Sequence, residues 1–396
     1  MKHEKKYRPA TLAVHAGVKE DLHTKAVGTP IYQTATFYLT DDVYEAMQRG
    51  MVRDEHIYTR YGNPTQKAAA EKIAALEGAQ SGLVFSSGMA AISSTLLAFL
   101  KPGDHVASAR DLYGGTHAFI RDTLPALGME VDFFDTEDAD GLKQAIRPNT
   151  RVVYFETLTN PLLKVADTET LARIAHDAGA LAIVDNTFPS PINLRPIEWG
   201  VDVVVHSGSK YLNGQGDLIC GAVAGSRKQT DLIWKNLLAY GGCLDPTAAY
   251  HLERGLKTLA IRVERHNVSS LKLAQWLEKQ PRVEQVFHPL LASNPRQALA
   301  QKYLSGGSGM VTFRIRGGDG AALEFLKHLQ LFKVAGSLGG VESLVSMPVK
   351  TSHVQFSERE RTAMGILPGT IRLSVGIEDA EDLKEDLAFA LNQVSR

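Results

Sequence analysis

Residues 201–211 constrain the fold of this chain most, because an apolar, valine-rich run there leads directly into a lysine. The run ends in Ser207, Gly208, Ser209 and Lys210. A short apolar run followed by glycine predicts a buried strand that ends in a tight turn. Lysine is rarely fully buried. Lys210 is therefore either a surface residue that caps the strand or a residue with a chemical role.

Two chemical properties would give Lys210 such a role. Desolvation lowers the pKa of a lysine, so that its neutral, nucleophilic amine is present near pH 7. A neutral amine forms a Schiff base with an aldehyde cofactor. The hydroxyls of Ser207 and Ser209 can both donate to a phosphate group, and pyridoxal 5′-phosphate (PLP) carries both an aldehyde and a phosphate.

Length and composition exclude several other classes of protein. The 396 residues predict two or three domains, with 44% hydrophobic and 22% charged residues, as in ordinary globular proteins. A net charge of −1 gives no electrostatic reason to expect nucleic acid or an anionic membrane as a partner. The only cysteines, Cys220 and Cys243, form neither a disulfide framework nor a metal site, so we expect a cytoplasmic protein without a metal. The charged start, residues 1–9, does not resemble a secretory signal, and no stretch reads as a membrane span.

Strand-like runs alternate with helical stretches through the middle of the chain. The runs are residues 82–85, 105–107, 131–134, 151–155, 181–184 and 201–205, and helical patterns cover residues 66–77, the stretch up to residue 100, and residues 167–176. This alternation predicts an α/β fold with a large, mostly parallel sheet covered on both faces. Open sheets of this kind bind ligands at the carboxyl ends of their strands.

The two ends of the chain differ from this middle part. Residues 1–60 have little periodicity apart from a helix-like stretch at 41–48, so we expect an arm that contacts a neighbouring subunit. After about residue 258, strands at 310–315 and 371–375 and helices at 268–279, at 321–329 and from about Asp379 predict a smaller C-terminal α/β domain. The predicted division is an arm (1–60), a large cofactor-binding domain (61–257) and a C-terminal domain (258–396).

Polar residues after the strands fit a phosphorylated, positively charged ring. Residues 86–89 lie between a strand and a helix, where backbone N–H groups can hold phosphate. The dinucleotide motif G-x-G-x-x-G is absent there. Asp185 ends a strand and can pair with a protonated ring nitrogen, although aspartate is also common in turns.

Three further residues extend this pattern. Tyr113 lies in a loop whose glycines allow close approach to a flat ligand, and Asn160 places an amide at the same sheet edge. Arg372 alternates with apolar neighbours on its strand, so its guanidinium can bind a substrate carboxylate. Taken singly, Tyr113 is equally consistent with a half-buried loop residue, Asn160 with a turn residue and Arg372 with a surface residue.

Together and in this order, the stretches closely resemble the PLP-dependent trans-sulfuration (Cys/Met metabolism) enzymes. This group includes cystathionine γ-lyase, methionine γ-lyase, cystathionine γ-synthase, homoserine-ester sulfhydrylases and cystathionine β-lyase. The matching segments span nearly the whole chain and are residues 58–65, 86–91, 111–116, 159–161, 184–188, 207–212, 254–259, 337–340 and 371–376. The resemblance implies the PLP-dependent aspartate-aminotransferase-like fold (fold type I).

The resemblance also implies a role for each site residue. Lys210 would hold PLP covalently and move protons, and the phosphate would be held by Gly88, Met89, Ser207 and Ser209. The ring would contact Tyr113, which also takes a proton from the substrate amine, as well as Asp185 and Thr187. The substrate carboxylate would be bound by Arg372, Asn160 and Ser337. Tyr58 and Arg60 would reach the phosphate of a neighbouring subunit, which implies a shared-site dimer, usually paired into a homotetramer.

Two departures from the family pattern bear on the substrate. Gly336 stands where cystathionine enzymes usually carry glutamate, and Gly115 stands where methionine γ-lyases usually carry cysteine. We favour a C–S γ-lyase that converts methionine, homocysteine or, less well, cystathionine into an α-keto acid, ammonia and a thiol. The alternatives are a γ-synthase or sulfhydrylase that uses O-acetyl- or O-succinyl-homoserine, and a PLP-binding protein without efficient turnover.

Overall fold

The computed structural model describes residues 7–19, 21–354 and 356–394. Most of the charged start, residues 1–6, lies outside the described residues. Within the described part of the chain, no helix is long and apolar enough to cross a membrane. The same part contains no group of three or more His, Cys, Asp or Glu side chains that could hold a metal ion.

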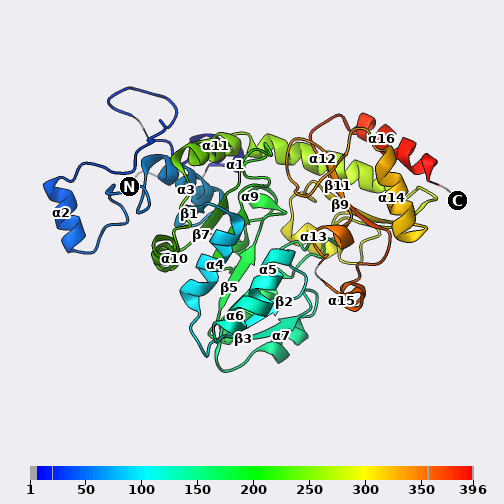
Figure 1. Cartoon of the computed structure of the whole chain (residues 1–396), viewed down its shortest axis with the longest axis horizontal. Helices are drawn as coiled ribbons and strands as arrows, with labels where there is room; N and C mark the ends of the chain where they lie inside the picture. Colours follow the sequence, from blue (N-terminus) through cyan, green and yellow to red (C-terminus); the bar gives the residue numbers. More distant parts are fainter. Residues whose placement is uncertain (1–6, 20, 355, 395–396) are drawn as a thin grey trace.

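A seven-stranded sheet forms the centre of the larger part of the molecule (Figure 1). Its strands lie in the order β1-β7-β6-β5-β4-β2-β3, and all neighbours are parallel except β7, which pairs antiparallel with β1 and β6. In chain order they are β1 (Ser81–Phe85), β2 (His105–Ala109), β3 (Glu130–Phe134), β4 (Thr150–Glu156), β5 (Leu181–Asp185), β6 (Val203–Ser207) and β7 (Gly221–Gly225). The prediction of a large, mostly parallel sheet is confirmed.

Helices cover both faces of this sheet. They are α3 (Pro64–Glu77), α4 (Gly88–Phe99), α5 (Gly114–Ala118), η1 (Phe119–Thr123), α6 (Leu124–Ala126), α7 (Ala139–Ala145), α8 (Thr168–Asp177), α9 (Ser190–Asn193), η2 (Pro196–Trp199), α10 (Arg227–Tyr240) and α11 (Pro246–Leu256). Phe85 belongs to the core on the side of α4 and α10, whereas its neighbour Val84 belongs to the core on the side of α3. Val204, in the centre of β6, has no exposed surface. Burial on both faces explains why β6 reads as a continuous apolar run.

A second, five-stranded sheet occupies the C-terminal part in the order β10-β11-β12-β9-β8 (Figure 1). Its strands are β8 (Val283–Phe287), β9 (Met310–Ile315), β10 (Lys333–Val334), β11 (Leu344–Ser346) and β12 (Thr370–Ser374). Its helices are α12 (Leu259–Leu277), α13 (Gln297–Tyr303), α14 (Gly318–His328), η3 (Pro348–Lys350), α15 (Glu358–Ala363) and α16 (Ala380–Gln393). Phe313 and Phe325 meet edge to face in its core. A smaller C-terminal α/β unit is confirmed, and the domain boundaries at residues 61 and 258 stay a proposal.

The N-terminal segment contributes little to either core. It contains α1 (Pro9–His15), which packs on α3 and α12, and α2 (Asp41–Gln48), which Figure 1 shows away from both sheets. The side chains of Val27 and Tyr38 are 94% and 96% exposed. This exposure fits an arm, while its contact with a neighbouring subunit stays a prediction.

Helix α12 and strand β7 are two of the elements that differ from the sequence-based expectation. Helix α12 begins at Leu259, nine residues before the predicted start. Strand β7 was not predicted, because its sequence consists of glycine, alanine and a single valine. Close packing explains this composition, since a Cβ on Gly221 would lie 2.1 Å from the backbone oxygen of Ser87.

Candidate active site

A cavity of about 760 Å³ opens at the carboxyl ends of the parallel strands, against loops of the second sheet. Its walls include all but two of the site residues expected from the sequence: Gly88, Met89, Tyr113, Asn160, Asp185, Thr187, Ser207, Ser209, Lys210, Ser337 and Arg372. These residues come from strand ends and loops that are up to about three hundred positions apart in the chain, so the fold alone brings them together.

Lys210 lies in the turn after β6 and belongs to the cavity wall, which excludes a simple surface cap. Its Nζ donates a hydrogen bond to Ser337 Oγ at 2.7 Å. Burial, together with the positive charge of Arg372, lowers the pKa of the Lys210 amine to about 8. A substantial fraction of this amine is therefore neutral and nucleophilic near pH 8.

One end of the cavity suits a phosphate group. Helix α4 begins at Gly88, with Ser87 as its N-cap, so that free backbone N–H groups and the positive end of the helix dipole meet there. A Cβ on Gly88 would lie 3.1 Å from Ser207, so glycine allows the close approach of the two segments. The Ser209 hydroxyl accepts a hydrogen bond from the Cys220 N–H at 2.9 Å and donates one to the Cys220 carbonyl at 3.3 Å.

The middle of the cavity suits a flat, positively charged ring. Asp185 is 7% exposed and accepts a hydrogen bond from the Thr187 N–H at 2.9 Å. Burial raises the pKa of the Asp185 carboxyl, and a cationic ring nitrogen would stabilise its charged form. The Tyr113 ring lies so close to Gly115 that a Cβ there would be 2.6 Å from Tyr113 Cε1. A side chain at position 115 would therefore collide with the Tyr113 ring as it is placed here.

The other end of the cavity suits a carboxylate. Arg372 is 5% exposed, and its Nη1 donates to Asn160 Oδ1 at 2.9 Å, while Nη2 donates to the Ser337 carbonyl at 3.2 Å. Burial lowers the pKa of Arg372 to about 10, which still leaves it positively charged. Its buried Nε has no hydrogen-bond partner within the described residues. Such a buried, incompletely satisfied cation fits an anionic ligand.

Glu156 is a wall residue that sequence reasoning missed. It ends β4, directly across from Asp185 on β5, and its carboxylate lines the cavity. Its signal in the sequence is a glutamate after an apolar strand, and this becomes informative only when the strand order is known.

The two site residues outside the cavity wall are Tyr58 and Arg60. Tyr58 is 41% exposed, and Arg60 donates to the Leu238 carbonyl at 3.0 Å on α10. The Arg60 guanidinium also lies over the rings of Tyr58 and Tyr61, at 5.9 and 5.1 Å from their centroids. Their predicted role in the site of a neighbouring subunit stays a prediction.

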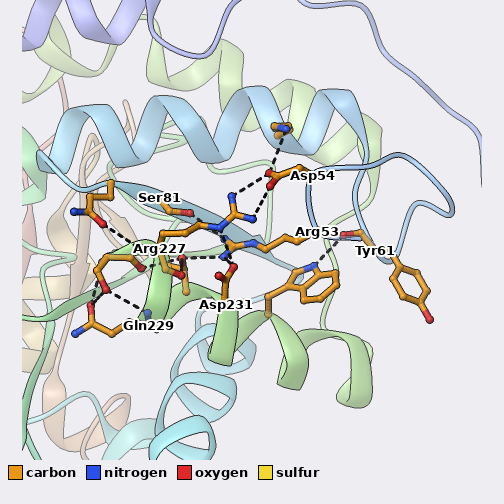
Figure 2. Close-up of polar contacts among 12 residues, drawn as sticks. Arg53, Asp54, Tyr61, Ser81, Arg227, Gln229 and Asp231 are labelled. Carbon is orange, nitrogen blue, oxygen red and sulfur yellow. Dashed lines mark hydrogen bonds and ion pairs between the residues drawn. The ribbon is translucent and has the colours of Figure 1, made fainter. Parts of the chain in front are cut away.

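Figure 2 shows how the chain just before Tyr58 is fixed to α10 and β1. Arg53 pairs with Asp231 and donates to the Ser81 hydroxyl at 3.0 Å. Arg227 contacts the same Asp231 at 2.9 Å and binds both carboxylate oxygens of Asp54, at 3.0 and 2.8 Å. We call these five residues the Arg53 network. Alternating charges hold the base of the arm in a defined position.

The residues present therefore fit PLP. The cavity offers an amine of lowered pKa, a helix N-terminus for the phosphate, a buried carboxyl group for the ring nitrogen and a buried arginine for a substrate carboxylate. Comparison with known proteins agrees. The family described as Cys/Met metabolism PLP-dependent enzyme matches residues 10–392.

Individual relatives cover almost the whole chain. The chain is 41% identical to an L-methionine γ-lyase of Fusobacterium nucleatum subsp. polymorphum, over 98% of this chain and 99% of that protein. It is 40% identical to a cystathionine γ-lyase of Bacillus subtilis, over 97% and 99%. The structure of cystathionine γ-lyase from Lactobacillus plantarum complexed with L-serine superposes with a TM-score of 0.92, at 35% identity over 98% of this chain and 99% of that one. The chain belongs to the Cys/Met metabolism family of PLP-dependent enzymes.

Proposed function

We propose that this enzyme is a C–S γ-lyase, which converts methionine or homocysteine and, less well, cystathionine into an α-keto acid, ammonia and a thiol. One observation carries the proposal. A lysine amine of lowered pKa shares a single cavity with a carboxyl group for the ring nitrogen and an arginine for the substrate. The names of the relatives support the same reaction class.

Substrate binding begins at the carboxylate. Arg372 and Asn160 are already bonded to each other, so their donors are oriented before a ligand arrives. The Ser337 carbonyl holds the second arm of the guanidinium. Because the Lys210 Nζ is bonded to the hydroxyl of the same Ser337, an amino acid on Arg372 has its Cα close to the lysine amine.

Proton transfer is the task of the protein side chains. Bound PLP supplies an electron sink that stabilises negative charge at Cα. Tyr113 would accept the proton of the incoming amino group. The Lys210 amine would move the Cα proton to the bound group and then remove a proton from Cβ, whose electrons expel the γ-sulfur. Protonation of that sulfur gives the thiol. A pKa near 8 suits this base, because an amine that titrates near the working pH both accepts and returns protons.

The distal end of the cavity favours a small, uncharged thioether. It is lined by Gly336, Leu218 and Ile219, and a Cβ on Gly336 would meet no atom within 4 Å. The Asp217 carboxylate, which also lines the cavity, accepts a hydrogen bond from Asn213 at 2.8 Å. Because position 336 is glycine, the distal ammonium of cystathionine has no glutamate partner there.

The same open space favours a second candidate, a γ-synthase or sulfhydrylase, since it would also accommodate the acyl group of an O-acyl-homoserine. A product assay separates the two. The enzyme is given methionine, homocysteine, cystathionine, cysteine, O-acetyl-homoserine or O-succinyl-homoserine, and the two esters are tested with and without sulfide or cysteine. A lyase releases 2-ketobutyrate and a thiol from the thioethers, whereas a synthase prefers the esters and needs the sulfur nucleophile. Pyruvate in place of 2-ketobutyrate from cystathionine would show β-elimination and contradict the proposal.

We also propose that the enzyme is a cytoplasmic homotetramer built from shared-site dimers. The exposed apolar side chains of the N-terminal segment and the outward position of Tyr58 support the assembly. Cys220 and Cys243 are both free thiols, which fits a reducing compartment.

A further inference from the structure

The carboxylate of Glu156 connects two loops that carry ligand-binding residues. It is 5% exposed, and each of its oxygens accepts one backbone N–H. Oε1 accepts from Tyr113 at 2.6 Å, and Oε2 accepts from Asn160 at 3.2 Å. Tyr113 is the residue just before α5, and Asn160 lies in the loop after β4. One side chain thus joins the ends of two different strand-to-helix connections.

The groups tied in this way face different parts of the ligand. Tyr113 is the expected ring-stacking residue, while the side chain of Asn160 contacts Arg372, the expected partner of the substrate carboxylate. A shift at Glu156 would therefore move the ring contact and the carboxylate contact relative to each other. Small displacements of this kind are costly in a site that works by pre-formed geometry.

We propose that Glu156 is a positioning residue, which fixes the distance between the Tyr113 loop and the Asn160 loop and so sets the affinity for the cofactor and the substrate. This inference rests on the proposed function. Glu156 acts through Tyr113 and Asn160 and does not take part in proton transfer.

The chemistry of the contact requires a carboxylate. An ionised carboxyl group is an acceptor at both oxygens, so it satisfies two N–H donors at once. Glutamine has the same length, but its NH₂ group would face one of the two N–H groups, and that loop must move. Aspartate keeps both acceptors but is one methylene shorter, so it reaches only one loop well.

The charged group next to Glu156 allows a positioning role to be distinguished from a role in stability alone. Burial and the nearby carboxyl of Asp185 raise the pKa of Glu156, while the two N–H bonds oppose this rise. Removing the charge would relieve the repulsion between the two carboxyl groups. A purely structural role thus predicts little loss of binding in Glu156→Gln, whereas positioning predicts weaker binding at unchanged or even higher thermal stability.

The experiment compares Glu156→Gln with a matched control, Asp386→Asn. Asp386 is also buried and also accepts backbone N–H groups, from Gln330, Leu331 and Phe332 at 2.7, 2.9 and 3.1 Å, but in the C-terminal part away from the cavity. Binding of PLP to each apoprotein is measured by equilibrium dialysis. Binding of glycine, an amino acid without a leaving group, to each PLP-loaded protein is measured by its absorbance change.

We expect Glu156→Gln to weaken binding of PLP and of glycine by roughly tenfold to a hundredfold, because a ligand contact misplaced by the shifted loops is worth about one hydrogen bond to a charged group. For the reacting substrate, KM should rise more than kcat falls. Asp386→Asn should lower the melting temperature and leave both affinities unchanged. Glu156→Asp should weaken both affinities by a smaller factor, and it carries the test if Glu156→Gln does not fold.

Unchanged affinities in folded Glu156→Gln, or equal losses in Asp386→Asn, would overturn the inference. Wild-type protein that failed to bind PLP would instead refute the proposed function, and the inference with it. The wild-type dialysis curve therefore distinguishes the two failures.

Discussion

Lys210 is the residue on which the proposed chemistry depends, since we propose it as both the attachment point of the cofactor and the proton carrier. Replacing it with alanine removes the amine while the rest of the cavity stays in place. We expect Lys210→Ala to lose the visible absorbance of covalently bound cofactor and to lower turnover by at least about 10²–10⁴-fold. Keto-acid release and an absorbance spectrum measure both effects. The exposed Lys143, paired with Asp140 on the surface, provides the control substitution Lys143→Ala. Turnover retained in Lys210→Ala would refute the assignment.

The lowered pKa of Lys210 predicts a pH dependence for cofactor capture. Only the neutral amine attacks an aldehyde, and its fraction grows as the pH rises through the pKa of about 8. The capture rate of the apoprotein should therefore rise about tenfold per pH unit below pH 7 and level off above about pH 9. Stopped-flow absorbance measures this rate. In Arg372→Gln the midpoint should move upward, because a positive charge that lowers the pKa is gone. A wild-type midpoint near the ordinary lysine value of about 10.4 would contradict the prediction.

Gly336 offers a test of substrate choice at one position. A Cβ at this position would meet no neighbouring atom within 4 Å, so a side chain can start there without a clash. We expect Gly336→Glu to raise kcat/KM for cystathionine relative to methionine by roughly tenfold, through an ion pair with the distal ammonium. Gly336→Gln has the same size without the charge and should leave the ratio unchanged. An equal change in both variants would mean that shape, and not charge, decides the preference.

At the scale of secondary-structure elements, α10 fixes the base of the N-terminal arm through the Arg53 network. The Arg53 side chain is 11% exposed and that of Arg227 is 43% exposed. Arg53→Ala should cost about 1.5–3 kcal/mol, because a charged hydrogen-bonding group is lost from a largely dry site. Arg227→Ala should cost less than about 1 kcal/mol, since water screens its pairs.

Thermal unfolding of the two variants measures this difference. Hydrogen exchange of residues 53–62 should increase mainly in Arg53→Ala. Similar melting temperatures for the two variants would show that burial of Arg53 does not strengthen its contacts.

Patterns within a few consecutive residues of the sequence predicted several helices and strands. A valine run followed by a glycine predicted strand β6 and the turn to Lys210, and β9 was predicted at its observed bounds. Strand β7 escaped prediction because tight packing against its neighbours, and not strand propensity, selects its small residues. Glu156 escaped for a related reason. Asn160 follows it in the next loop, but Tyr113 comes from the loop after another strand, and only the strand order brings that loop to Glu156.

At the scale of the whole molecule, the proposed sharing of sites predicts complementation between two defective subunits. Lys210→Ala removes the amine from a subunit's own cavity, and Arg60→Ala removes the group offered to the neighbour. In a hybrid dimer one site carries both defects and the other carries neither. Random re-association of the two inactive variants should therefore restore about a quarter of wild-type activity. Mixtures that stay inactive, although mass measurements show hybrids, would mean that each cavity is complete within one chain.

The cavity draws residues from both sheets, which also share one buried apolar cluster that includes Val84 and Met310. Lys210 and Asp185 follow strands of the seven-stranded sheet, whereas Arg372 lies on β12 of the other sheet. In the proposed binding mode, an amino acid would contact residues of both sheets and would hold the two parts together. Heat resistance should therefore grow with the logarithm of ligand concentration once the site is saturated. In a cell, a shortage of the cofactor or of the amino acid would therefore lower the heat resistance of this enzyme.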